Sequence, residues 1–475
     1  MQRRVYTHPN KVQKPRVSTY LAWFVGLIVL AWIFYLIYKT YPSASSPKFA
    51  NLRTIENKIA QYPDKQPNQL PSQPLFSGAS QKTKGGPTDK PFAHDSPDID
   101  SSHVDSSLVV VFSTDCSSYQ DWQTLLLFHS ALVVGQKGVL IRIASGCDSQ
   151  KQKVLQNLYR ELHPEYRVHF TPDYKKDPKT GEKYQFYNKP FGVKHWLENS
   201  NPPIPSGTVI ALVDPDFIFL RPLSAKLSGQ NNNLISGLVK QSEIFDSVTK
   251  GKPVAQQYGL GAPWANDHSK EFNRTYICGG KSSPCMSVKT ISEGDKFYSV
   301  GPPYILERDD LYRLTKTWCF FVPRVYEGYP SLLAEMYGYS TAAAHENLPH
   351  LRMDHYMVSN IHAGGEGWQW IDALGDDVCD PPVNGIYFPD KPLPTFIHYC
   401  QAYRISSFGF AKHRTTAYDM FSCKSPMLSN IPDNFIEFDF FLNDKNEASS
   451  PKSRFVENVL LMFQYFLLTL IPICF

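Results

Sequence analysis

The chain has 475 residues, enough for one large domain or two medium ones with appended segments. Its net charge of +4 is small, and no basic run alternates with aromatic residues, so the composition argues against a nucleic-acid partner. Aromatic residues make up 14% of the chain, which suits a core with a pocket for a flat or sugar-like ligand.

The N-terminal region predicts a membrane anchor. Residues 1–19 contain Arg and Lys but no acidic residue, and residues 20–38 form an uninterrupted apolar and aromatic run. As a helix this run would be about 28 Å long, close to the thickness of a hydrocarbon core. We therefore predict a cytosolic tail over 1–19, a single transmembrane segment over 20–38 and a lumenal remainder. A cleaved signal peptide is the alternative, because small residues follow at 43–45.

Residues 39–106 are rich in Pro, Ser, Gln, Lys and Asp and show no sustained hydrophobic period. Such a segment buries too little apolar surface to offset the entropy of ordering it. We predict a disordered lumenal stem that carries a folded head over residues 107–430.

Cysteine usage agrees with a lumenal head. Apart from Cys474, the number of cysteines is even, and no CxxC pair suggests a zinc site, so an oxidising compartment would favour disulfides. Cys278 and Cys285 bracket a short Gly/Ser/Pro loop and are the first candidates for a bridge. Asn273 begins an Asn-Arg-Thr sequon for N-glycosylation.

The head begins with an alternation of strands and helices. Apolar runs predict strands at 108–112, 139–144, 168–170 and 209–213. Helical patterns lie between them, around Trp122 and over 151–162 and 190–197. This order predicts an α/β fold with a largely parallel sheet covered by helices. Beyond residue 223 the pattern loosens into loops up to about 301, and then predicts helices at 308–314 and 332–344.

Two carboxylates follow directly after the strand at 209–213, in the motif Asp214-Pro215-Asp216. Residues two apart in an extended segment point the same way, so both carboxylates could face one cation. Ligands in open α/β sheets bind beyond the carboxyl ends of the strands, which favours a site here. The alternative is a turn in which both aspartates cap neighbouring amides.

Two later segments add candidate site residues. A short apolar strand at 395–399 contains His398, which could offer a lone pair to a metal or simply lie in the core. Glu335 is an acid within a mostly apolar helix, either salt-bridged at a core boundary or placed at a pocket. After a C-terminal extension over 431–455, residues 456–475 form an apolar tail that could be a membrane-surface helix, a second span or a helix docked on the head.

Taken together, the motifs resemble those of the plant and algal peptidyl serine α-galactosyltransferases and, more distantly, the hydroxyproline O-arabinosyltransferases. The resemblance extends over much of residues 108–423. Its carriers are Phe112-Ser113-Thr114-Asp115-Cys116 with Tyr119, Asp121-Trp122-Gln123-Thr124, His129-Ser130, Ser145-Gly146-Cys147, Pro178-Lys179-Thr180-Gly181, Asn188-Lys189-Pro190, Gly192-Val193, His195-Trp196-Leu197, Asp214-Pro215-Asp216, Glu335-Met336-Tyr337-Gly338-Tyr339 and His398-Tyr399.

The resemblance implies a GT-A-like fold that binds a UDP-sugar together with a divalent cation, usually Mn²⁺. It assigns the metal to Asp214, Asp216 and His398. Thr114 and Asp115 would meet the uridine and ribose, and Asp214 would also face the nucleotide sugar. Arg142 and Lys189 would either counter the diphosphate or pair with carboxylates.

The resemblance also implies transfer with retention of anomeric configuration, from the UDP-sugar to Ser or hydroxyproline of secretory-pathway proteins in the Golgi or endoplasmic reticulum. Glu335 and Asp354 are the candidates for contacts with the sugar or the acceptor. The motifs favour galactose as the donor sugar, with UDP-arabinofuranose as the alternative. A non-catalytic lumenal protein that binds a glycan or peptide is the competing hypothesis.

Overall fold

The computed structural model describes residues 108–176, 181–227, 244–359, 366, 394–400 and 412, and the backbone of 403–405 and 408–410. All of these residues belong to one compact unit. The tail, anchor and stem predicted over 1–106, and the C-terminal segments predicted over 431–475, lie outside the described residues. None of the described helices has the length and apolar character needed to cross a membrane.

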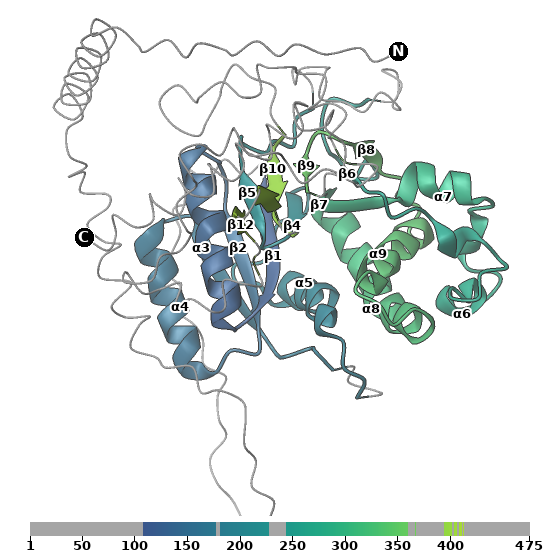
Figure 1. Ribbon diagram of the computed structural model, residues 1–475, viewed down its shortest axis with the longest axis horizontal. Helices are drawn as coiled ribbons and strands as arrows, with labels where there is room; N and C mark the ends of the chain where they lie inside the picture. Colours follow the sequence, from purple (N-terminus) through teal and green to yellow (C-terminus); the bar gives the residue numbers. More distant parts are fainter. Residues whose placement is uncertain are drawn as a thin grey trace, which may run out of the picture. The chain divides into compact units, whose positions relative to one another are not determined.

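A seven-stranded sheet with the order β3-β2-β1-β4-β7-β6-β8 forms the centre of the fold (Figure 1). Only β7 is antiparallel to its neighbours, so the other six strands run in one direction. The strands are β1 (Val109–Asp115), β2 (Leu140–Ser145), β3 (Tyr166–Thr171), β4 (Val209–Val213), β6 (Val254–Gln257), β7 (Val300–Glu307) and β8 (Leu351–Met353). The predicted α/β class with a largely parallel sheet is confirmed.

Helices cover both faces of this sheet, because its central strands are apolar on both sides. All five residues of β4 are buried. Ile210 and Leu212 join the core beneath α5 (Asn188–Asn199), α8 (Arg308–Gly328) and α9 (Ala334–His345). Val209, Ala211 and Val213 join the core beneath α3 (Ser118–Val133) and α4 (Ser149–Leu162). Strand alternation thus divides the molecule into two hydrophobic layers.

Helix α9 lies close against α8, and a glycine makes this possible. A Cβ on Gly338 would come within 3.1 Å of Val322 in α8. The indole nitrogen of Trp318 in α8 donates to the backbone oxygen of Glu335 at 2.9 Å. The first turn of α9, and with it Glu335, is therefore fixed by α8.

A second sheet of three strands lies beyond the end of β4. It has the order β5-β10-β9, formed by β5 (Phe217–Phe219), β10 (Phe396–His398) and β9 (Met357–Val358). Strand β10 is antiparallel to β5 and parallel to β9. A separate pair is formed by β11 (Tyr403–Ile405) and β12 (Phe408–Phe410). This small sheet brings residues near 398 beside residues near 216.

The region between 224 and 301, predicted as loops, contains more regular structure than expected. It includes β6, α6 (Arg274–Ile277), α7 (Ile291–Tyr298) and the start of β7. Strand β7 contains Gly301, Pro302 and Pro303, which are unfavourable for a strand, but its two antiparallel neighbours impose the extended conformation. The helix predicted at 308–314 continues to Gly328.

Two disulfides are present among the described residues. The expected Cys278–Cys285 bridge is confirmed, and Cys116 is joined to Cys147. The second bridge ties the end of β1 to the end of β2, and therefore fixes two neighbouring strand ends at the edge where Asp214 also lies.

Candidate functional site

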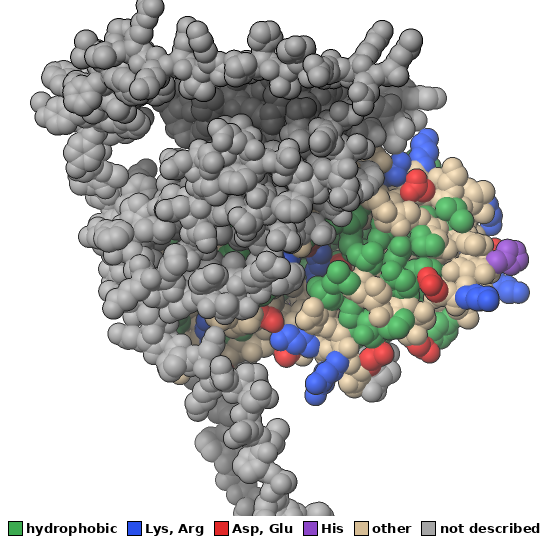
Figure 2. All heavy atoms as spheres, viewed as in Figure 1, with side chains coloured by type: hydrophobic (Ala, Val, Ile, Leu, Met, Phe, Trp, Pro, Cys, Tyr) green, Lys and Arg blue, Asp and Glu red, His purple; other side chains and the backbone are tan. Residues whose placement is uncertain are grey.

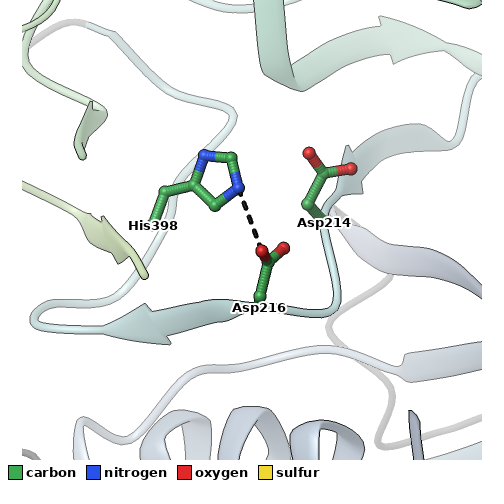
Figure 3. A group of neighbouring side chains, drawn as sticks. All are labelled: Asp214, Asp216 and His398. Carbon is green, nitrogen blue, oxygen red and sulfur yellow. Dashed lines mark ion pairs between the residues drawn. The ribbon is translucent and has the colours of Figure 1, made fainter. Parts of the chain in front are cut away.

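The site is built at the carboxyl end of β4, where Asp214 and Asp216 follow the strand. The turn that contains Pro215 leads straight into β5, in which Phe217 pairs with His398 of β10. The amide of Tyr399 donates to the backbone oxygen of Asp216 at 3.1 Å, which extends the same ladder. Strand pairing across more than 180 residues of sequence therefore places His398 beside Asp216 (Figure 3).

The three predicted metal ligands form one cluster. One ligand atom from each of Asp214, Asp216 and His398 lies within 4.8 Å of the others. Figure 3 shows the three side chains directed toward a common space, with an ion pair of 3.3 Å between His398 Nε2 and Asp216 Oδ2. Two carboxylates and an imidazole are a donor set that can hold a divalent cation.

Asp216 is buried and is bound by two cationic groups. Besides His398, the ammonium of Lys412 contacts Asp216 Oδ2. Burial alone would raise the pKa of Asp216, but His398 and Lys412 hold it well below its usual value. Burial alone would lower the pKa of His398, but Asp216 raises it well above its usual value. Asp216 is therefore the anionic partner of both cationic groups.

Asp214 belongs to a second chain of charges on the other side of the cluster. Lys189, in the first turn of α5, lies 2.7 Å from Asp214 Oδ1 and 3.5 Å from Glu335 Oε1. Burial raises the pKa of Glu335 to about 7, against the lowering effect of Lys189 and with a further rise from Asp214. Burial opposes the charge of Lys189, but Asp214 and Glu335 raise its pKa above the usual value. Glu335 can therefore change its protonation state near neutral pH.

Aromatic rings enclose this chain of charges. Lys189 Nζ lies 5.9 Å from the centroid of the Tyr304 ring, and Tyr304 stacks on Tyr339 with ring centroids 3.8 Å apart. Burial, followed by the charges of Glu335 and Asp214, raises the pKa of the Tyr304 hydroxyl well above its usual value. The apolar rings lower the local dielectric and strengthen every charge interaction beside them.

Arg142, predicted either to counter a diphosphate or to pair with carboxylates, is fully buried and bonded to protein groups. Its nitrogens donate to Thr114 Oγ1 at 2.7 Å, Asp121 Oδ1 at 2.7 Å and the Asp115 backbone oxygen at 2.8 Å. Tyr159 accepts a further hydrogen bond at 2.6 Å. The geometry corresponds to the second alternative, in which Arg142 braces the ends of β1 and β2.

The other predicted nucleotide-binding residues lie at the end of β1. Thr114 is buried and accepts from Arg142, whereas the Asp115 side chain is 25% exposed and pairs with Lys175 at 3.1 Å. Burial would raise the pKa of Asp115, but hydrogen bonds from Ser117 and the charge of Lys175 lower it. Because β1 is parallel to β4, Asp115 lies at the same sheet edge as Asp214, as the prediction requires.

Asp354, the second candidate for a sugar or acceptor contact, follows β8. Strand β8 runs in the same direction as β4, with β7 and β6 between them. Asp354 is therefore at the same edge of the sheet but three strands away from Asp214, and it is not a member of the metal-ligand cluster. Its backbone oxygen accepts a hydrogen bond of 3.3 Å from Gln256.

Sequence reasoning missed Lys412 and Tyr184. Lys412 lies in a region with no periodic pattern, so only the folded chain shows its contact with Asp216. The hydroxyl of Tyr184 accepts from the amide of Glu335 at 2.9 Å and donates to the oxygen of Leu332 at 2.8 Å. The sequence shows only a tyrosine in a polar loop, which does not indicate that its hydroxyl would bond to Glu335.

No protein-family model matches the chain. Two curated proteins are similar in sequence to this chain, and both are called peptidyl serine α-galactosyltransferase. The protein from Arabidopsis thaliana is 29% identical over 263 residues, which are 54% of this chain and 28% of the relative. The protein from Chlamydomonas reinhardtii is 24% identical over 332 residues, or 66% of this chain and 37% of the relative. The resemblance drawn from the motifs is confirmed, and the chain spans little more than a third of these relatives at most.

Among solved structures, the apo structure of the bifunctional glycosyltransferase WbbM is similar to this chain. The match covers 63% of this chain and 46% of the WbbM chain, with 11% sequence identity. The TM-score of 0.31 is too low to indicate a shared fold.

Proposed function

We propose that this chain, a relative of the peptidyl serine α-galactosyltransferases, is a retaining, metal-dependent glycosyltransferase with a GT-A-like head. It transfers a sugar, in our proposal galactose, from a UDP-sugar to Ser or hydroxyproline hydroxyls of secretory-pathway proteins. The observation that carries the proposal is the cluster of Asp214, Asp216 and His398, whose ligand atoms lie within 4.8 Å of one another. This cluster is at the strand ends where ligands bind in α/β sheets.

The residues of the cluster fit a divalent cation such as Mn²⁺. Asp216 keeps its negative charge, and it already binds the cationic Lys412. Asp214 adds a second carboxylate and His398 a nitrogen ligand once its proton is released. A cation held here would stabilise the negative charge of the departing diphosphate.

The other charged groups are placed to act on the donor sugar. In a retaining transfer, the bond from the anomeric carbon to the diphosphate oxygen breaks while the acceptor hydroxyl oxygen bonds to the same face. The hydroxyl proton passes to the departing phosphate oxygen, so no separate base is needed. Lys189 is a cation beside Asp214, suited to the diphosphate charge, and Glu335 lies 3.5 Å from Lys189, suited to a sugar hydroxyl or the developing positive charge.

The identity of the sugar and the acceptor is the most specific part of the proposal. The curated relatives are called peptidyl serine α-galactosyltransferases, which supports galactose and serine. Transfer of arabinofuranose to hydroxyproline is the alternative within the same chemistry. The two disulfides support an oxidising compartment, and we propose a Golgi enzyme anchored through residues 20–38.

The test is to incubate the purified full chain with Mn²⁺ and either UDP-galactose or UDP-arabinofuranose, with peptides containing Ser or hydroxyproline. We expect UDP release and a glycosylated peptide with UDP-galactose, both lost when the metal is chelated. An Asp216→Asn variant provides the control for contaminating transferases. Binding of peptide or glycan without UDP release under any condition would instead support a non-catalytic binding protein.

A further inference from the structure

A cleft of about 890 Å³ lies between the loop that precedes α5 and the turn that joins α8 to α9. It is separate from the metal-ligand cluster, none of whose residues lines it. Its size is within the range of binding sites for small ligands and short peptide segments. The residues that matter below are Lys175, Lys176, Lys183, Tyr184, Phe186 and Tyr326.

The floor of the cleft is aromatic. Tyr184 stacks on Tyr326 with ring centroids 4.2 Å apart, and Phe186 lies 5.4 Å from the Tyr184 ring. Leu332, which also lines the cleft, is 61% exposed and adds apolar surface to it. Aromatic-lined grooves recognise extended, PPII-like polypeptide segments, whose preformed backbone keeps the entropic cost of binding low.

The rim of the cleft is basic. Lys176 and Lys183 face each other across an antiparallel bridge, and both are exposed. Lys175 is held by Asp115 at 3.1 Å. Among the described residues that line the cleft, Asp173 is the only acid. Positive charge therefore exceeds negative charge, which favours a ligand with acidic side chains.

The floor is also connected to the proposed catalytic residues. The Tyr184 hydroxyl accepts from the amide of Glu335 at 2.9 Å, and the Glu335 carboxylate is 3.5 Å from Lys189, which pairs with Asp214. A chain bound against Tyr184 would therefore lie next to the first turn of α9.

We propose that this cleft binds the acceptor polypeptide as an extended segment in which Asp or Glu residues flank the hydroxyl-bearing residue. The inference rests on the proposed function and adds the chemical class of its acceptor. The aromatic floor binds the backbone and apolar side chains, and the exposed Lys176 and Lys183 pair with the flanking carboxylates.

The test measures peptide binding directly, so it does not depend on turnover. Fluorescence anisotropy would compare labelled Ser-containing peptides whose flanking residues are Glu, Gln or Lys, on the full chain and on a Lys176→Gln, Lys183→Gln double variant. Lys153→Gln, an exposed lysine of α4, is the matched control. We expect the double variant to bind the Glu peptide about tenfold more weakly, the Gln peptide unchanged, and the difference to shrink at high salt.

Two results would overturn the inference. One is equal affinity of the wild-type chain for the Glu, Gln and Lys peptides. The other is a double variant that keeps its preference for the Glu peptide but loses affinity for UDP, since the lysines would then serve the donor diphosphate. Lysine-dependent binding of the Glu peptide, with no UDP-sugar ever consumed, would uphold the cleft and contradict the enzymatic function.

Discussion

The two aspartates of the cluster are two residues apart in sequence, but their surroundings differ. Asp216 is 5% exposed and is bound by His398 and Lys412. The side chain of Asp214 is 20% exposed and is bound by Lys189, which also contacts Glu335. Asp216 is thus fixed by strand pairing and buried cations, whereas Asp214 is linked to a group whose charge can change near neutral pH. We infer that Asp216 mainly holds the cation and Asp214 mainly connects it to the reacting sugar.

Replacing Asp216 should have the largest effect. In Asp216→Asn the charge that offsets His398 and Lys412 is lost, and these groups would then repel a divalent cation. We expect calorimetry to detect no Mn²⁺ binding to this variant. The rate of sugar transfer should fall at least about a hundredfold. Asp246→Asn, at an exposed position, is the control. Unchanged Mn²⁺ affinity in Asp216→Asn would exclude this residue as a metal ligand.

Replacing Asp214 should have a smaller effect on the same measurements. Asp214→Asn keeps an oxygen ligand and leaves Asp216 and His398 in place, so we expect Mn²⁺ affinity to fall about tenfold. The side-chain neighbour Lys189 would lose its closer partner and retain Glu335. If Asp214→Asn weakens Mn²⁺ binding more than Asp216→Asn does, the division of roles between the two aspartates is wrong.

Glu335→Gln should change how stability depends on pH. The carboxyl of Glu335 has an ordinary pKa of 4.5, and burial in the fold raises this pKa to about 7. Between these values the folded protein holds a proton that the unfolded chain releases, so the stability of the wild type falls as pH rises, by about 3 kcal/mol in all. The Glu335→Gln protein has no titrating group at this position. Its unfolding free energy should therefore rise relative to that of the wild type as the pH increases across this range.

The measurement is the unfolding free energy of both proteins at a series of pH values, without added metal or nucleotide. Glu271→Gln, at an exposed site, is the control. A difference between Glu335→Gln and wild type that stays constant from pH 4.5 to pH 7 would contradict a buried, titrating carboxyl at this position.

The sequence predicted the two aspartates better than the groups that bind them. The apolar run of β4 and the Asp214-Pro215-Asp216 motif are local features, and the first four strands were expected where they occur. His398 was assigned through a family resemblance, because no local pattern predicts the pairing of β10 with β5. Lys412 was missed for the same reason. Strand β7 was missed because Gly301, Pro302 and Pro303 disfavour a strand in the sequence, and only pairing with the neighbouring strands imposes the extended conformation.

Tyr184→Phe should have the smallest effect, confined to the Asp214 side. The ring keeps its stacking on Tyr326, but the amide of Glu335 and the oxygen of Leu332 lose their partner. Each lost bond costs about 1 kcal/mol, enough to loosen the first turn of α9 and lower kcat by about fivefold. Because Asp216, His398 and Lys412 are untouched, Mn²⁺ affinity should stay at the wild-type value. Tyr312→Phe, whose hydroxyl bonds Glu198 at the surface at 3.2 Å, is the matched control. A Tyr184→Phe protein that loses Mn²⁺ affinity would show that the two sides of the cluster are one coupled unit.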